Sequence, residues 1–159
     1  MKKTIVVFLT LLSIGAFAGN APLPAELMQA KTVYIISHRI QDGRVLPDPS
    51  GDATYVDACR DELAKWGRFK VVSDPKEADL IFRIGSRVQT SYMVINNQSR
   101  KEGNGVTFLE VVQTSSGKVL WSGTHNWAWS WSVKSARTVV VKQLRKSMEE
   151  QEVAECKDK

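Results

Sequence analysis

The side chains best suited to catalysis or metal binding are few in this chain, which holds two histidines, His38 and His125, and two cysteines, Cys59 and Cys156. A zinc site needs several His, Cys or carboxylate ligands at matched spacings, and neither histidine belongs to an HxxxH or CxxC pattern. A nucleophilic enzyme would need a positioned base or an elbow such as G-x-S-x-G, which the sequence lacks. The sequence therefore predicts no metal, no cofactor and no enzymatic activity, and a hydrolase is only the third alternative.

Aromatic residues are the second group of interest, because four of the five tryptophans lie between positions 121 and 131. From position 119 onward, the alternation of a β-strand separates an aromatic face from a mostly small and polar one. The aromatic set is Val119, Trp121, Gly123, His125, Trp127, Trp129 and Trp131. We expect Val119 and Trp121 to pack beneath helices, since large aromatic side chains dominate core energetics.

The distal tryptophans lead to a functional hypothesis. A strand that ran as far as Trp131 would exceed the typical ~5 to 6 residues, so its end should overhang the core. Trp127, Trp129 and Trp131, together with His125, would then form an exposed platform that stacks on a sugar ring or on a partner's apolar surface. The alternative is that these side chains cover the end of the final helix.

Two arginines define a second candidate surface. Arg83 and Arg87 alternate with the apolar residues of the segment ADLIFRIGSRV, so they belong to the face opposite Leu80, Phe82, Ile84 and Val88. Thr124 and Asn126 would join the arginines if the open side of one sheet carried both strands. The preferred interpretation is a solvated face. The sharper hypothesis is contact with an acidic protein or a glycan.

The first residues predict export. Lys2 and Lys3 precede an apolar run over 5–14, and the sequence Ala16-Phe17-Ala18 fits the small-x-small pattern of a signal peptidase site. We expect residues 1–18 to be a cleaved signal peptide, with no membrane span afterwards and a periplasmic or secreted location. Removal of two lysines lowers the net charge from +5 to +3, too mild a balance to predict a nucleic-acid partner.

Export makes a disulfide between Cys59 and Cys156 one of two open alternatives. Such a bridge would close a long loop and contribute roughly 4 kcal/mol in the chain-entropy model. In the other alternative, Cys59 is a small buried residue on a helix face and Cys156 is a free thiol near the chain end.

The remaining patterns give the order of elements. Strands are expected over 31–37, 68–72 and 78–88 and on both sides of the turn at 114–117, where Gly117 permits a positive φ. Helices are expected over 52–66, ended by Gly67, and over 136–151. Residues 39–52 are expected to be a surface loop, because breakers dominate them. Residues 89–105 are expected to be a mobile hairpin loop, although the segment from Tyr92 to Ile95 could extend the preceding strand.

These elements predict a single α+β domain over residues 31–154, preceded by an irregular lead over 19–30 and followed by a frayed tail over 155–159. Its order is strand, helix, three or four strands, helix. The economical architecture is a two-layer sandwich, in which a mostly antiparallel sheet of four to five strands carries two helices on one face.

Three phrases of the chain resemble a type of small bacterial envelope domain. WGRFKVVSDPKEADLIFRI and TSSGKVLWSG are similar to segments of the amino-terminal domain of TolB and of CsgG-like proteins of the curli secretion channel, and ARTVVVKQLRKSMEE takes the place of their closing helix. No cysteine lies near the cleavage site, unlike in the lipoprotein members. The resemblance implies the fold, the compartment and a role in envelope assembly or protein contact.

Together these observations predict an exported, non-enzymatic interaction module of the bacterial cell envelope. Its expected partner is an envelope protein or a second copy of itself. The alternative function is binding of peptidoglycan, another glycan or a small ligand through the tryptophan platform.

Overall fold

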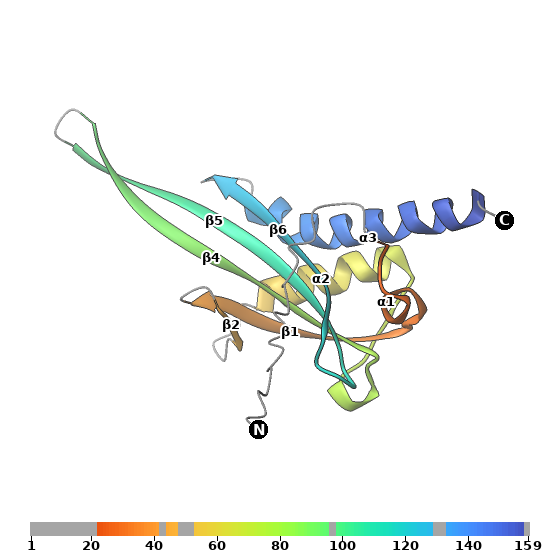
Figure 1. Ribbon diagram of the computed structural model, residues 1–159. Coiled ribbons are helices and arrows are strands. Elements are labelled where there is room, and N and C mark those ends of the chain that lie inside the picture. Colours follow the sequence, from red (N-terminus) through yellow and green to blue (C-terminus); the bar gives the residue numbers. More distant parts are fainter. Residues whose placement is uncertain (1–21, 42–43, 48–52, 96–97, 129–132, 158–159) are drawn as a thin grey trace, which may run out of the picture.

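The computed structural model describes residues 22–41, 44–47, 53–95, 98–128 and 133–157 (Figure 1). Two long helices and six strands make up most of it, with a short helix before the first strand and a 3-10 turn before the fourth. The elements are α1 (Ala25–Gln29), β1 (Thr32–Gln41), β2 (Arg44–Pro47), α2 (Ala53–Trp66), β3 (Lys70–Val71), η1 (Pro75–Glu77), β4 (Leu80–Ile95), β5 (Gln98–Gln113), β6 (Val119–Ala128) and α3 (Val133–Lys157).

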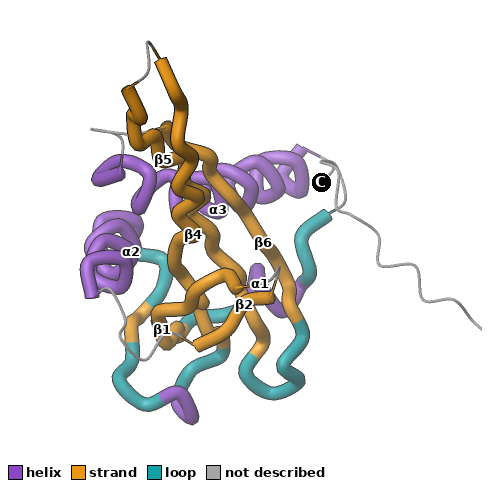
Figure 2. The backbone as a smooth tube through the Cα atoms, turned by 90° about the vertical axis from the view of Figure 1, so that its left-hand side faces the viewer, coloured by secondary structure: helices purple, strands orange, loops and turns teal. Residues whose placement is uncertain are grey.

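The strands form one sheet in the order β2-β1-β4-β5-β6, and β3 pairs with β1. β1 runs parallel to both β3 and β4, while the other pairs are antiparallel. α2 and α3 lie on one face of this sheet and pack against each other (Figures 1 and 2). The predicted α+β two-layer sandwich is therefore confirmed, with a mixed sheet that has more strands than the four to five expected.

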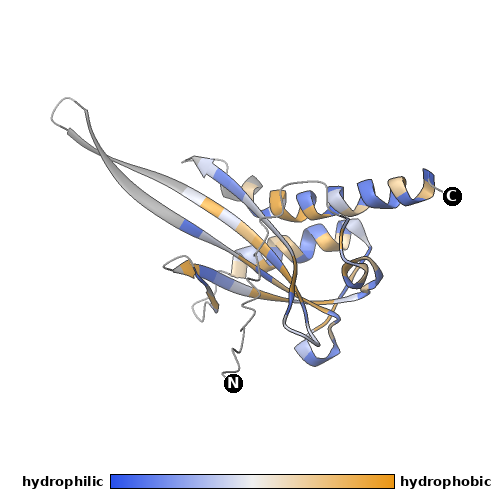
Figure 3. Ribbon diagram, in the orientation of Figure 1, coloured by the Kyte–Doolittle hydropathy of each residue, from blue (hydrophilic) through white to orange (hydrophobic). Residues whose placement is uncertain are grey.

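The core lies between the sheet and the two long helices, where apolar residues gather (Figure 3). Leu80, Phe82 and Ile84 are buried as the strand alternation predicts. On the helices, the core positions are spaced by three or four residues, as expected of an amphipathic helix. They are Tyr55, Cys59 and Leu63 on α2 and Val140, Leu144 and Met148 on α3, with Val141 buried beside Val140.

The structure confirms two glycine positions predicted from the sequence. α2 ends at Trp66, and Gly67 follows it with a φ of 72°. The connection between β5 and β6 contains Gly117 with a φ of 69°. Both values lie in the left-handed region that glycine enters without steric penalty, so a residue with a Cβ would be strained at either position.

The start of β6 departs from simple alternation. Val111 pairs with Trp121 whereas Val112 pairs with Val119, so Leu120 is an extra residue in a β-bulge. The bulge turns Leu120 into the core, where only 5% of it is exposed, and leaves Val119 45% exposed. The prediction that Val119 packs beneath the helices was therefore wrong.

Two segments predicted to be loops contain strands. Within 39–52, β1 continues to Gln41 and β2 returns beside it, with Pro47 at the end of an edge strand, where a missing N–H is tolerated. Within 89–105, β4 and β5 stay paired up to Ile95 and Gln98. Neither segment alternates between apolar and polar residues, and both contain breakers or many polar residues. The sequence pattern therefore does not predict these strands.

The two ends of the domain are more ordered than the sequence indicates. α1 lies inside the predicted irregular lead, and its Leu27 is fully buried in the core. Arg68 donates a hydrogen bond of 2.7 Å to the carbonyl oxygen of Met28 and also pairs with Glu152 of α3. α3 is helical through Lys157, so the tail predicted to fray from residue 155 is part of the helix.

Candidate interaction surface

Trp127 does not belong to an exposed platform. Only 7% of its surface is accessible, and its indole Nε1 donates a hydrogen bond of 3.1 Å to the hydroxyl of the fully buried Thr107. Its ring lies against Gly105 of the adjacent strand, where a Cβ would come within 2.0 Å of the indole. The predicted exposure of Trp127 was therefore wrong, because the missing side chain of Gly105 makes room for the ring. Trp129 and Trp131 lie outside the described residues.

Trp121 occupies the place that the sequence predicts for it. Its side chain is partly buried and packs against the core cluster. A Cβ on Gly123 would lie 2.2 Å from the Cη2 atom of this ring, so the indole rests on the glycine two residues further along β6. Each of these two tryptophans thus lies over a glycine on the helix-covered side of the sheet.

The predicted arginine surface is present, but its charge is partly neutralised. Strand register places Arg83 and Arg87 on the sheet face that carries no long helix. Across β5, Arg83 lies in the same cross-strand row as Ser122 of β6, and Arg87 lies in the same row as Asn126. Thr124 and Asn126 are exposed on this face, as expected. However, Arg83 lies 3.6 Å from the carboxylate of Glu110, which leaves Arg87 as the exposed arginine of the pair.

The predicted surface residues do not form one site. His125 pairs with Thr107 on the helix-covered side of the sheet, next to Trp127. Arg83 and Arg87 occupy the opposite face. The predicted alternation is thus confirmed for these residues, and it places His125 and the two arginines on opposite faces of the sheet.

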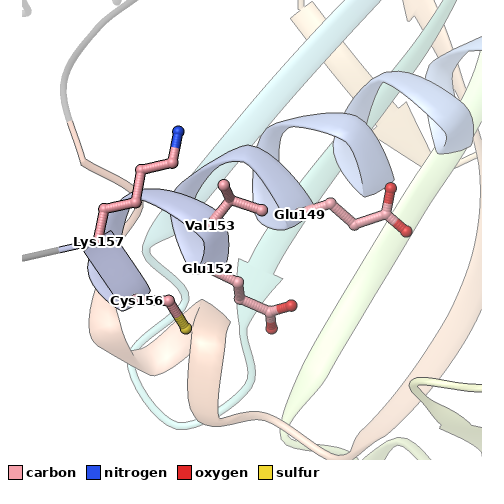
Figure 4. Close-up of a pocket in the computed structure, with 5 residues that line it drawn as sticks. All are labelled: Glu149, Glu152, Val153, Cys156 and Lys157. Carbon is pink, nitrogen blue, oxygen red and sulfur yellow. The ribbon is translucent and has the colours of Figure 1, made fainter. Parts of the chain in front are cut away.

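The two cysteines are both free. Cys59 is fully buried in α2, and this burial raises the pKa of its thiol to about 12. Cys156 is exposed on the last turn of α3, in an open groove lined by Glu149, Glu152, Val153 and Lys157 (Figure 4). The disulfide alternative is therefore not found, because one sulfur is enclosed by the core and the other faces solvent.

His38 is a buried group that the sequence does not single out as such. Its side chain is 6% exposed, and its Nδ1 has no hydrogen-bond partner within the described structure. Burial, and secondarily the nearby charge of Arg83, lower the pKa of this imidazole below 6.5. β1 continues past His38, and β2 pairs with it through Pro47.

The packing around His38 is close. His38 pairs with Gly85, where a Cβ would lie 1.7 Å from the His38 carbonyl oxygen, and Phe108 of β5 packs beside the same glycine. No group of three His, Cys, Asp or Glu residues that could hold a metal occurs among the described residues. We find no catalytic arrangement around this imidazole in that part of the chain.

The most distinctive feature of the molecule is the length of β4 and β5. They pair continuously from Leu80 and Gln113 to Ile95 and Gln98. β1 accompanies β4 only as far as Ser86, and β6 accompanies β5 only down to Asn104. Residues 87–95 and 98–103, here called the arm, therefore form a two-stranded ribbon that projects from the body (Figures 1 and 2).

The arm exposes backbone that could bind a partner. Along both of its outer edges, no other strand of the described chain pairs with it. Unpaired N–H and C=O groups along a strand edge are a template for strand addition. A two-stranded ribbon is also only marginally stable alone, and a third strand would stabilise it. This makes the arm the candidate interaction surface.

Comparison with solved structures finds similar folds among bacterial proteins. The PelC dodecamer of Paraburkholderia phytofirmans superposes with a TM-score of 0.50 at 16% identity, over 80% of this chain and 95% of that one. A minor lipoprotein of Acinetobacter baumannii gives 0.43 at 11% identity, over 79% and 94% of the two chains. Lipoprotein GNA1162 of Neisseria meningitidis gives 0.44 at 13% identity, over 76% and 99%.

No protein-family model matches the sequence, and no curated protein matches it either. The class defined by fold is therefore a small α+β domain of the kind found in PelC, with an arm extending from its sheet. The resemblance predicted from the sequence agrees with the PelC structure in fold, as a small α+β domain. The narrower resemblance to TolB or to the CsgG-like family stays a prediction.

Proposed function

We propose that this protein is an exported, non-enzymatic interaction module of the bacterial cell envelope, and that it acts by contact with further copies of itself. The observation that carries the proposal is the arm, whose two strand edges are unpaired within the described chain. The arm is an extended ribbon that projects from the body of the sheet (Figure 1). It is suited to reach a neighbouring molecule.

Two further observations support self-association as the form of contact. The fold is shared with PelC, a protein that forms a dodecamer. Most soluble oligomers consist of identical chains with closed symmetry, so a second copy is the simplest partner for an unpaired strand edge.

The side chains support contact over catalysis. A thiol with a pKa of about 12 is protonated at neutral pH, and Cys59 has no solvent access through which to attack a substrate. His38 is similarly enclosed by the sheet, with no carboxylate or nucleophile hydrogen-bonded to its Nδ1 among the described residues.

The compartment rests on the first eighteen residues. The basic start, apolar run and Ala-Phe-Ala site are those of a signal peptide, and a cleaved product would enter the periplasm or be secreted. Across the described helices, none combines the length and the apolar character that crossing a bilayer would require.

The test is the mass of the processed protein in solution, measured by size-exclusion chromatography with light scattering over a range of concentrations. We expect an oligomer for the full chain. A variant in which residues 90–103 are replaced by a two-residue Asn-Gly turn should be smaller or monomeric, with unchanged helix content by circular dichroism.

A matched control separates loss of the arm from general damage. Ser115→Asn alters the exposed turn at the other end of β5 and should keep the mass of the original protein. A full-length chain that remains monomeric at every concentration would refute self-association. An arm-deleted variant that keeps the full oligomeric mass would refute the role of the arm.

A further inference from the structure

We infer that the outer edge of β6 in one copy of this chain accepts the β4 edge of the arm of a second copy. The neighbour's arm thereby extends the sheet by strand addition. This inference rests on the proposed self-association and specifies which two surfaces meet. It is carried by a contrast between the strand edges that the described chain leaves unpaired.

Two of these edges carry features that oppose strand addition. β2 forms one margin of the sheet, and it has only four residues, among them Arg44 and Pro47. The β5 edge of the arm has the sequence QSRKEG, with three consecutive charged residues followed by a glycine. Short length, charge and proline are the means by which soluble proteins protect their sheet edges.

β6 forms the other margin of the sheet and lacks this protection. Its ten residues, VLWSGTHNWA, include no Lys, Arg, Asp, Glu or Pro. The bulge at Leu120 lies at the start of β6, next to the turn. The rest of the strand pairs regularly with β5 up to Ala128. A long, uncharged and unpaired edge of this kind is the sort that another strand joins.

The β4 edge of the arm is the matching surface. Residues 87–95 read RVQTSYMVI, with a single charged residue and several that favour strands. Nine residues of strand extend roughly 30 Å, comparable to the length of β6. The two unprotected edges are therefore similar in length and in chemical character.

One molecule cannot join these two edges to each other. β5 lies between β4 and β6 in the sheet, so the two edges face outward on opposite sides. Each copy would give its arm to one neighbour and accept the arm of another. Such a head-to-tail contact continues from molecule to molecule, and it closes into a ring when the rotation between neighbours allows.

Disulfide cross-linking tests this pairing directly. The background is Cys156→Ser, which removes the exposed thiol and keeps the buried Cys59. Donor variants carry Ser91→Cys or Met93→Cys on the arm, and acceptor variants carry Ser122→Cys or Thr124→Cys on β6. Chains carrying both a donor and an acceptor change should give a ladder of covalent oligomers after mild oxidation.

The variants that carry only a donor or only an acceptor cysteine are the controls, and they distinguish between the possible pairings of strand edges. We expect no covalent dimer from a donor variant alone or from an acceptor variant alone. In the proposed contact, the arm of one copy pairs with β6 of another copy, and no arm pairs with an arm and no β6 with a β6. A covalent dimer from the arm variants alone would show that two arms pair symmetrically, and it would overturn the inference. An oligomer by light scattering that no double variant cross-links would also overturn it, while leaving the proposed function intact.

A charge on the edge provides an independent readout. Thr124 is exposed on β6, and Thr124→Lys should weaken association by about tenfold or more, equivalent to about 1.4 kcal/mol. Ser115→Lys places the same charge in the exposed turn and should leave the association unchanged. Equal association in both variants, at equal thermal midpoints, would contradict the assignment of β6. A monomeric parent protein would instead refute self-association itself.

Discussion

The indole of Trp127 lies across Gly105, its register partner on β5, and its Nε1 is hydrogen-bonded to Thr107 two residues further along the same strand. Gly105 and Asn104 are the last β5 residues that β6 accompanies before the arm continues alone. The tryptophan therefore anchors the outer strand at the root of the arm. Its burial fixes the position of an edge that we propose as an acceptor.

The close approach of the ring predicts a large effect of a small substitution. In Gly105→Ala, the added methyl group would lie 2.0 Å from the indole, so the ring must move. We expect a loss of about 1 to 3 kcal/mol in the free energy of unfolding, the range of overpacked cores. Urea denaturation followed by tryptophan fluorescence measures it.

Two outcomes of that experiment are informative. Ser115→Ala, in an exposed turn, should change the unfolding free energy by less than about 0.5 kcal/mol. If Gly105→Ala were as stable as this control, the indole could not be packed against the glycine. The buried anchor at the root of the arm would then be rejected.

Much of the body of this fold can be predicted from its sequence, because burial on one face imposes a period. Leu80, Phe82 and Ile84 alternate in β4, and Gly67 and Gly117 mark positions where only a positive φ lets the chain turn. These signals are local, and they gave the sandwich and the central hairpin. The bulge at Leu120 shifts the alternation by one residue, and no local pattern in the sequence predicts it.

The candidate surface was harder to predict for a physical reason. Alternation assigns Trp127 to a face of the sheet, but it does not tell whether something covers that face or whether a glycine on the next strand makes room for the ring. The polar stretch of the arm, QSRKEG, shows no alternation of apolar and polar residues that would predict a strand. Its pairing follows only from the continued register of β4 with β5, a relationship between segments.

His38 predicts a pH dependence of stability near neutrality. Its folded-state pKa is lowered by burial and by Arg83, so the unfolded chain binds a proton more readily than the folded one. Stability should therefore be complete above about pH 6.5, the unfolded pKa, and should decrease as the pH falls below it. Denaturation midpoints at intervals between pH 7.5 and pH 5.5 (roughly one unit to each side of that pKa) measure this slope.

The variant that tests the assignment is His38→Gln, which cannot titrate. It should lose the slope in this window, whereas Ser122→Ala, exposed on the same sheet face, should retain it. An unchanged slope in His38→Gln would mean that another group is responsible.

Asp79 predicts a second dependence at lower pH. Its carboxylate accepts hydrogen bonds of 2.8 and 2.9 Å from the backbone N–H groups of Lys31 and Thr32, which lower its pKa below 3.8. The stabilisation is present above the unfolded pKa and is lost as the pH falls through the folded one. Because Asp79 is exposed and solvent weakens its interactions, Asp79→Ala should cost about 1 kcal/mol at pH 7.

The expected difference between Asp79→Ala and the parent should diminish at a pH below the folded value, where the parent carboxyl is protonated too. Asp61→Ala is the control, since Asp61 is exposed on α2. Equal losses for Asp79→Ala at neutral and at strongly acidic pH would rule out a charged acceptor at the start of β1.

The cysteines predict a simple chemical result. Cys156 is exposed and Cys59 is enclosed with a pKa of about 12, so one thiol should react rapidly with a disulfide reagent in the native protein. The second should react only after unfolding, and Cys156→Ser should abolish the native reaction while Cys59→Ala leaves it intact. If instead neither thiol reacted until a reductant was added, the two sulfurs would be bonded to each other. In that case α2 and the end of α3 would have to approach more closely than the packing of Cys59 inside the core allows.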